Sequence, residues 1–241
     1  MLDKKSPLPM YYQIEEDIKQ KIDSAIYSER ETIPSERELS EQYEVSRMTV
    51  RQAVTNLVNE GYLYREKGKG TFVAEKKIEQ PLQGMTSFTE DMKQRGMDSS
   101  SKLLDFTIIP PPADIKRKLS LEEDRQVYEI HRIRYADHQP MAVERTFIPV
   151  ALVPGMQEKD VYGSIYEYIE KNHDYTIHKA TQMIEATIAD EEQAELLDIV
   201  PAAAILHIER TSLLQDGTPF EVVKSSYRAD RYKFISEIHR S

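Results

Sequence analysis

The sequence IPSERELSEQYEVSRMTVRQAVTNLVNEGYLYREKGKGTFV, residues 33–73, predicts two short helices followed by a hairpin. Ser35 and Glu38 follow Pro34 with the spacing of a capping box, in which each side chain binds the backbone amide of the other at a helix start. Ser46 can cap the next helix, and Gly61 follows it where a glycine commonly ends a helix. The apolar residues of that helix recur at i, i+3, i+4, i+7 and i+8, and they are Val50, Ala53, Val54, Leu57 and Val58.

The segments on either side of these two helices add a first helix and the hairpin. Residues 63–65 and 71–73 are strand-like, and the glycines in residues 66–70 predict a short connection between them. Three helices followed by a hairpin predict a winged helix-turn-helix, which binds DNA, in residues 1–75. The stripe of the first helix consists of apolar residues at helical spacing: Tyr11, Ile14, Ile18 and Ile22.

The second helix of a helix-turn-helix presents its N-terminal residues to base edges. With the apolar stripe of residues 46–60 facing the core, the other side of that helix carries side chains that bind guanine or adenine. The cationic, glycine-bearing hairpin suits close approach to a groove or to the backbone. A solvated helix and turn is the alternative for each of these residues taken alone. The candidate DNA-binding residues are Arg37, Arg47, Thr49, Arg51, Gln52, Lys67, Gly68 and Lys69.

Composition excludes several classes of protein. The net charge of −10 over 241 residues argues against a uniformly basic coat protein, while residues 46–73 carry five basic residues against two carboxylates. The absence of cysteine excludes disulfides and thiolate metal sites. The chain shows neither a signal peptide nor an apolar run long enough to cross a membrane. We therefore expect a cytoplasmic protein without a metal, a cofactor or a membrane partner.

The chain after residue 75 predicts a second domain of a different kind. Residues 76–84 are charged and break the helical pattern, which predicts a linker. Residues 85–241 alternate strands and capped helices, so the whole chain is expected to be α+β. Two hairpins in this domain, residues 128–149 and 205–228, resemble each other, because each has a proline just after the turn and a glutamate in the return strand.

An anion site is the first candidate in this domain. Side chains alternate faces along a strand, so Arg132 and Arg134 point the same way. Two guanidinium groups on one face repel each other unless an anion lies between them or water screens them. Ser164 begins a helix with Glu167 at capping distance, and helix starts attract anions. The alternative is a solvated sheet face.

A polar ligand would need further groups beside an anion site. Ser87 and Glu90 have the spacing of another capping box. Glu144 and Glu221 lie in the return strands of the two hairpins. A buried carboxylate is costly without donors, which sugar hydroxyls could supply, whereas a solvated glutamate is the alternative.

Several motifs resemble a known family. Residues 33–39, 46–53, 60–63 and 68–73 look like the signature of the GntR family of bacterial regulators. From about residue 80 the chain resembles the UTRA-type effector-binding domain of the HutC subgroup, most closely in residues 82–93 and 225–232. Within that subgroup the chain is similar to repressors of N-acetylglucosamine utilisation from Gram-positive bacteria. One departure is the sequence VPAAA at residues 200–204, where a glycine-containing turn is expected.

The resemblance implies a chorismate-lyase-like, antiparallel-sheet fold for the second domain and a repressor function for the chain. The repressor would bind a palindromic operator as a homodimer and would be released by glucosamine-6-phosphate or N-acetylglucosamine-6-phosphate. Carried over by position, Arg37, Arg47 and Arg51 would make the main DNA contacts. The phosphate would be held by Arg132, Arg134, Ser164 and Tyr166, and the sugar would be surrounded by Phe88, Thr89, Glu144, Glu221 and Tyr227.

Two alternatives stay open at this stage. The same repressor could respond to another phosphosugar, to a carboxylate such as urocanate, or to a fatty acyl group, although the arginine pair disfavours a neutral lipid. A lyase-like enzyme is the second alternative. Catalysis would need a positioned acid, base or nucleophile, and the six histidines show neither metal-ligand spacing nor a partner motif. We therefore expect the chain not to be an enzyme.

Overall fold

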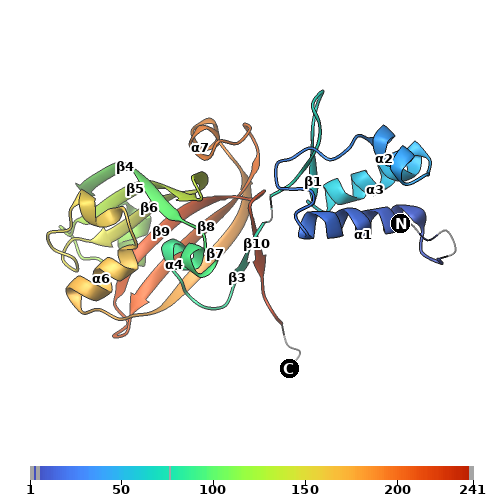
Figure 1. Cartoon of the computed structure of the whole chain (residues 1–241). Coiled ribbons are helices and arrows are strands. Elements are labelled where there is room, and N and C mark those ends of the chain that lie inside the picture. The colour runs from blue at the N-terminus through green and yellow to red at the C-terminus, as the bar shows by residue number, and fades with distance from the viewer. Residues whose placement is uncertain (1–2, 4–5, 76, 239–241) are drawn as a thin grey trace. The chain divides into compact units, whose positions relative to one another are not determined.

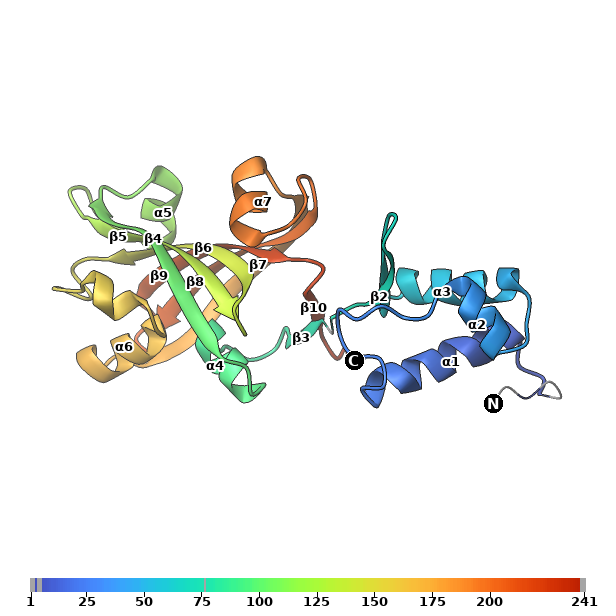
Figure 2. The ribbon, with the colours of Figure 1, turned by 45° about the horizontal axis from the view of Figure 1, so that its top comes forward.

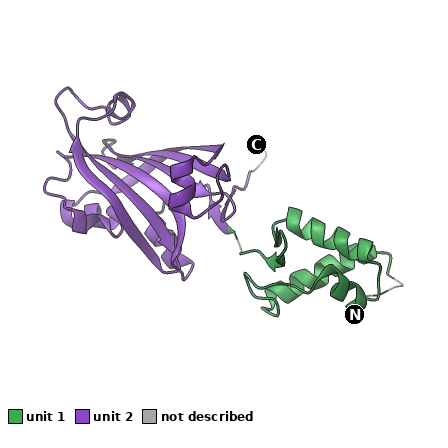
Figure 3. Ribbon diagram, turned by 90° about the horizontal axis from the view of Figure 1, so that it is seen from above, with its two compact units in different colours: residues 1–77 green, residues 78–241 purple. Residues whose placement is uncertain are grey.

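The structure is a computed structural model that describes residues 3, 6–75 and 77–238. The chain divides between Lys77 and Ile78 into two units, which are coloured separately in Figure 3. Residues 1–2, 4–5, 76 and 239–241, which belong to the expected domains and linker, lie outside the described residues. The first unit consists of α1 (Met10–Asp23), α2 (Glu36–Gln42), α3 (Arg47–Asn59), β1 (Leu63–Glu66) and β2 (Gly70–Val73).

The first unit is the expected winged helix-turn-helix. The capping box of α2 forms in both directions between Ser35 and Glu38, and the Ser46 hydroxyl accepts a hydrogen bond from the backbone amide of Thr49 at the start of α3. Strands β1 and β2 pair antiparallel, with Leu63 opposite Val73. The apolar stripes of α1 and α3 are buried in one core with Leu39, Leu63 and Val73.

The second unit is built on a six-stranded antiparallel sheet in the order β4-β5-β6-β9-β8-β7 (Figure 1). In Figure 2, α5 and α7 lie on one side of this sheet, and α4 and α6 lie on the other. The elements of the second unit are β3 (Ile78–Pro81), α4 (Phe88–Gln94), β4 (Ser99–Ile109), α5 (Ala113–Lys118), β5 (Val127–Ala136), β6 (Gln139–Pro149), the 3-10 helix η1 (Glu158–Val161), α6 (Ile165–His173), β7 (Ile177–Ile188), α7 (Glu191–Leu197), β8 (Ala204–Leu214), β9 (Pro219–Arg228) and β10 (Tyr232–Ile235).

Side-chain alternation determines which helices cover which face. Tyr128 and Ile130 of β5 pack against α6, whereas Ile133 of the same strand packs against α7. The two similar hairpins, β5-β6 and β8-β9, lie next to each other because β6 pairs with β9. The even-numbered side chains of β5, including both arginines, therefore face the side of the sheet on which α4 and α6 lie.

The stretch expected to be a linker contains a strand. Residues 78–81 form β3, which pairs in parallel with β10, with Ile78 opposite Tyr232. This strand belongs to the second unit, which begins at Ile78. The partner of β3 lies near the other end of the chain, so no local pattern could indicate the pairing.

Two smaller expectations also differ from the structure. Ser164 caps α6 by accepting from the amide of Glu167, but the carboxylate of Glu167 pairs with Lys171 and does not complete a capping box. In residues 200–204, where a glycine is expected, Ala202 adopts a φ of 60°. This left-handed conformation is the one that glycine favours, so the turn is retained at the cost of some backbone strain.

Among the described residues, every helix is too short or too polar to cross a membrane.

Candidate nucleic-acid interface and ligand cavity

The outer face of α3 carries most of the expected DNA-binding side chains. Val50, Ala53, Val54 and Leu57 are buried, so the opposite side of the helix faces solvent. Arg47, Arg51 and Gln52 are exposed, and Thr49 is half-buried. On the hairpin between β1 and β2, the expected residues Lys67, Gly68 and Lys69 are all exposed, and Gly68 has a φ of 80°.

A carboxylate on α2 orients two arginines beside this face. One oxygen of Glu36 lies 2.9 Å from Nε of Arg51, and the other lies 3.3 Å from Nη2 of Arg65. Arg65 also donates to the hydroxyl of Thr55 over 3.0 Å. These contacts tie the start of α2 to α3 and β1, while the side chain of Arg51 stays 59% exposed. Sequence reasoning missed Glu36 as an orienting residue.

Arg37 is only loosely held on α2. Its side chain is 71% exposed, and its Nε lies 3.1 Å from Glu41 one helical turn later. An exposed ion pair of this kind contributes little to stability, so a phosphate could replace Glu41 at little cost.

The ligand cavity lies over the face of the sheet that α4 and α6 cover. It brings together eight of the nine residues expected to bind an effector. Thr89 is the exception, because it does not line the cavity and instead accepts a hydrogen bond from Nη2 of Arg134 over 2.8 Å. The eight lining residues are Phe88, Arg132, Arg134, Glu144, Ser164, Tyr166, Glu221 and Tyr227.

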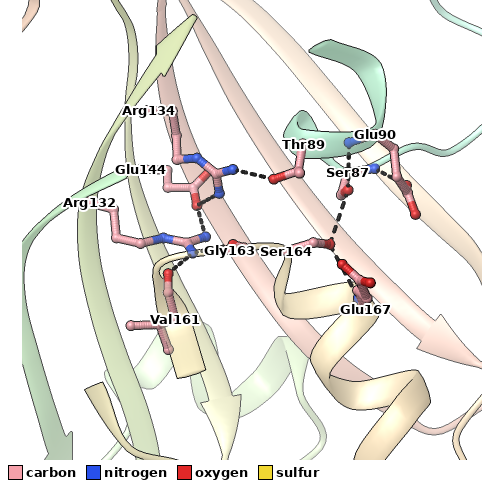
Figure 4. Close-up of polar contacts among 10 residues, drawn as sticks. All are labelled: Ser87, Thr89, Glu90, Arg132, Arg134, Glu144, Val161, Gly163, Ser164 and Glu167. Carbon is pink, nitrogen blue, oxygen red and sulfur yellow. Dashed lines mark hydrogen bonds and ion pairs between the residues drawn. The ribbon is translucent and has the colours of Figure 1, made fainter. Parts of the chain in front are cut away.

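Glu144 lies between the two arginines of β5 (Figure 4). It is the cross-strand neighbour of Arg132, and its Oε1 accepts from Nη2 of Arg132 and, over 3.3 Å, from Nη1 of Arg134. The side chains of the two arginines are 3% and 4% exposed. The anion between them is thus a carboxylate of the chain itself, and the alternative of a solvated sheet face is wrong for these two side chains.

The remaining contacts of the two arginines anchor them to the helices above the sheet. Nη1 of Arg132 donates to the carbonyl of Val161 and, over 3.3 Å, to that of Gly163, just before α6. The guanidinium carbon of Arg134 lies 4.8 Å from the centre of the Phe88 ring on α4. The hydroxyls of Ser164 and Ser87, which cap α6 and α4, lie 3.2 Å apart. Both helix starts thus meet at the arginine pair.

Both arginines keep an unused donor. Among the described residues, Nε of Arg132 and Nε of Arg134 are buried without a hydrogen-bond partner. A buried donor without an acceptor costs free energy that an anionic oxygen would recover.

The charges of the cavity do not cancel. Burial favours the neutral form of Glu144, but Arg132 and Arg134 outweigh it and hold the pKa of Glu144 below its ordinary value. Burial raises the pKa of Glu221 to about 8, with Arg210 opposing the shift. Three guanidinium groups therefore face the ionised Glu144 and a Glu221 whose raised pKa favours its protonated form at neutral pH, while Asp91, which also lines the cavity, pairs with Arg95 over 2.9 Å. Positive charge is thus in excess.

Arg210 on β8 is the third guanidinium group, and sequence reasoning missed it. Its Nε and Nη2 donate to Gln182 on β7 over 3.0 and 2.7 Å, and its Nη1 donates to the carbonyl of Thr86 before α4. The likeness of the two hairpins was the available signal, because Arg210 occupies the outgoing strand of the second hairpin as Arg132 occupies that of the first. Gln80, Tyr232 and Phe234 also line the cavity, and they were missed because the β3-β10 pair was not expected.

The wild-type chain is expected to become less stable as pH rises from 6 to 9. Glu221→Gln is expected not to show this decrease. The folded pKa of Glu221 lies above its unfolded value, so the folded chain binds more protons. Stability then falls as pH rises through the folded pKa, by roughly 2–3 kcal/mol between pH 6 and pH 9. The measurement is the free energy of unfolding in urea at pH 6 and pH 9.

The control is Glu195→Gln at an exposed position of α7, which should keep the wild-type pH dependence. An equally steep decline in Glu221→Gln and in wild type would show that Glu221 is not the group that titrates.

Comparisons with known proteins match both units. Residues 10–73 match the model of bacterial regulatory proteins, gntR family, and residues 94–233 match the model of the UTRA domain. The HTH-type transcriptional repressor NagR of Bacillus subtilis (strain 168) is 46% identical over 239 residues, which cover 99% of this chain and 98% of that protein. The mannosyl-D-glycerate transport/metabolism system repressor MngR of Escherichia coli (strain K12) is 32% identical over 94% of each chain. The crystal structure of PhnF from Mycobacterium smegmatis aligns with a TM-score of 0.69 at 28% identity, over 95% of this chain and 100% of that one. Both units and their order thus recur in these proteins.

Proposed function

Since the chain belongs to the gntR family of bacterial regulatory proteins, with a UTRA domain as in the HutC subgroup, we propose that it represses transcription as a homodimer on a palindromic operator. The proposed effector is an amino-sugar phosphate, either glucosamine-6-phosphate or N-acetylglucosamine-6-phosphate. Its binding in the cavity of the second unit releases the operator.

The exposed face of α3 supports the assignment of the reading residues. Arg47 and Arg51 carry the planar group that binds guanine bidentately, and Gln52 carries the amide that binds adenine. Arg37 and the hairpin residues 67–69 supply cations and backbone amides for phosphates. All of these residues are exposed, and the remaining candidate, Thr49, is half-buried.

The edge strand β7 supports the homodimer. It is 12 residues long, none of its residues is buried, and its one sheet neighbour in the described chain is β8. A long exposed edge is a place where a second copy of the chain can add its own strand. A two-fold dimer would also match the symmetry of a palindromic operator. Sedimentation equilibrium should give a mass twice that of one chain, and the mass of a single chain at micromolar concentration would refute the dimer.

The excess of guanidinium groups in the buried cavity, where Arg132, Arg134 and Arg210 lie together, is the observation that carries the effector assignment. A phosphomonoester bears a charge of about −1.5 to −2 at neutral pH and offers three acceptor oxygens. The unused Nε donors of Arg132 and Arg134, the hydroxyls of Ser164 and Tyr166, and the start of α6 supply donors for these oxygens. The name of MngR, a relative at 32% identity, describes it as a repressor of a mannosyl-D-glycerate transport and metabolism system. Mannosyl-D-glycerate is a sugar derivative.

The remainder of the cavity suits a hydroxylated ring. Glu144 and Glu221 can accept hydrogen bonds from hydroxyl groups, and an ionised Glu144 also favours an ammonium group. Phe88 and Tyr227 supply flat apolar surfaces beside these carboxylates. A neutral fatty acyl chain would leave the guanidinium donors without acceptors, so the structure disfavours it.

Titration of the full chain with four compounds tests the effector: glucosamine-6-phosphate, N-acetylglucosamine-6-phosphate, glucose-6-phosphate and free glucosamine. One of the two amino-sugar phosphates should raise the melting temperature by roughly 5 °C at a hundredfold excess over its Kd. The same compound should weaken binding to an operator duplex selected by the chain from random DNA.

The other two compounds separate the parts of the assignment. An equal response to free glucosamine would show that the charge of the cavity is not used. An equal response to glucose-6-phosphate would show that the amino group is not recognised. The effector would then be assigned as a phosphosugar in general and not as an amino-sugar phosphate. If no compound alters either signal while the duplex is still bound, the effector assignment is wrong and the DNA assignment stands.

A further inference from the structure

Met48 is a large apolar side chain that the fold leaves in solvent on the helix expected to read DNA. It lies in the first turn of α3 and is 68% exposed. At about 100° per residue, it lies almost directly opposite the buried stripe of Val50, Ala53, Val54 and Leu57. Exposure of such a side chain costs free energy, so a partner that covers it would recover that cost.

The residues around Met48 are polar and belong to the same face. Gln52 and Thr55 follow Met48 at i+4 and i+7 and form one line along the helix with it. Met48, Gln52 and Thr55 line a shallow hollow together with Thr49, Arg51 and Asn56. Met48 is therefore a single apolar point in the middle of a hydrogen-bonding surface. A protein partner would require a larger apolar patch.

One feature of a DNA base edge is complementary to this point. In the major groove the base edges carry donors and acceptors, and the C5 methyl group of thymine is the apolar exception. We infer that Met48 reads a thymine of the operator through contact between its side chain and this methyl group. The inference rests on the proposed binding of operator DNA and adds a specificity-determining residue to it.

The position of Met48 also relates this thymine to a second base. Four helical residues rise about 6 Å, and successive base pairs are about 3.4 Å apart, so Met48 and Gln52 reach bases about two steps from each other. Gln52 binds adenine through its amide. The thymine is therefore expected within about two base pairs of an adenine in each half-site. The flexible, unbranched side chain of methionine suits contact with a methyl group whose position varies with DNA shape.

Replacement of thymine by deoxyuracil tests the inference, because it removes one methyl group and keeps every hydrogen-bonding group. The full wild-type chain first selects a duplex from random DNA, and each thymine of that duplex is then replaced in turn. At one thymine per half-site, the replacement should weaken wild-type binding about fourfold, the equivalent of ~0.8 kcal/mol for one buried methyl group.

Three variants complete the test. Met48→Ala should bind the thymine and deoxyuracil duplexes equally, whereas Met48→Leu should keep the preference for thymine. Val200→Ala, at an exposed apolar residue after α7 in the second unit, should behave as wild type. If no thymine distinguishes wild type from Met48→Ala, the inference is wrong although the duplex is bound. Failure to select any duplex would instead contradict the proposed function.

Discussion

Arg132→Ala should abolish the release of operator DNA by an amino-sugar phosphate and leave operator binding within about twofold of wild type. The guanidinium group of Arg132 is buried in the cavity, contacts Glu144 and the start of α6, and retains an unused Nε donor. Loss of a buried, hydrogen-bonded charge from a binding site should reduce affinity for the effector on the order of 100-fold. Effector affinity from calorimetry and operator affinity in the presence of the effector measure the two halves of the result.

The design must separate ligand binding from folding. Removal of Arg132 alone leaves the buried Glu144 with Arg134 as its remaining cation, which costs stability. The double variant Arg132→Met with Glu144→Gln removes both charges together and should also fail to respond. Arg145→Ala is the matched control, because this arginine of β6 is half-exposed and pairs with Glu129 away from the cavity. Unchanged release in the double variant would show that the phosphate binds elsewhere.

Arg51→Ala is expected to weaken operator binding on the order of 100-fold or more, because a homodimer loses a contact worth ~1–3 kcal/mol in each half-site. The arginine lies on the exposed face of α3, and Glu36 holds its Nε. Binding of the selected duplex at several salt concentrations gives both the affinity and the number of phosphate contacts that remain. The thermal shift with the effector should stay as in wild type, since the cavity lies in the other unit.

Arg117→Ala, at an exposed position of α5, removes the same charge from the second unit and should leave operator binding unchanged. Arg51→Ala and Arg132→Ala then form a reciprocal pair. Arg51→Ala should lose operator binding and keep effector binding, whereas Arg132→Ala should lose effector binding and keep operator binding. If Arg51→Ala binds the operator with wild-type affinity, Arg51 does not contact the operator and the assignment of α3 as the reading surface is wrong.

The features that could be predicted from the sequence depend on near neighbours in the chain. The capping boxes at Ser35 and Ser87 join residues three positions apart, and both form as expected. The stripe of α3 follows from the helical repeat, so the exposed face with Arg47, Arg51 and Gln52 could be assigned before the fold was known. Strand alternation likewise placed Arg132 and Arg134 on one face.

Features that join distant segments could not be predicted in the same way. The β3-β10 pair brings residues 78–81 beside residues 232–235, and it adds Gln80 and Phe234 to the cavity. Gln182 and Thr86 hold Arg210 at the cavity from separate parts of the chain. The half capping box at Ser164 shows that even a local motif can yield to a competing contact, because Lys171 takes the carboxylate of Glu167.

The sequence by itself thus determined the winged helix-turn-helix, the exposed face of α3 and the fact that the two arginines of β5 point to the same side of the sheet. These properties arise from hydrogen bonds and side-chain repeats within a few residues. Only the tertiary structure decided that Glu144 lies between the arginines, that burial raises the pKa of Glu221 to about 8, and that Arg210 adds a third cation. The charge of the cavity depends on burial and on strand neighbours far apart in the chain, and neither is encoded in a local pattern.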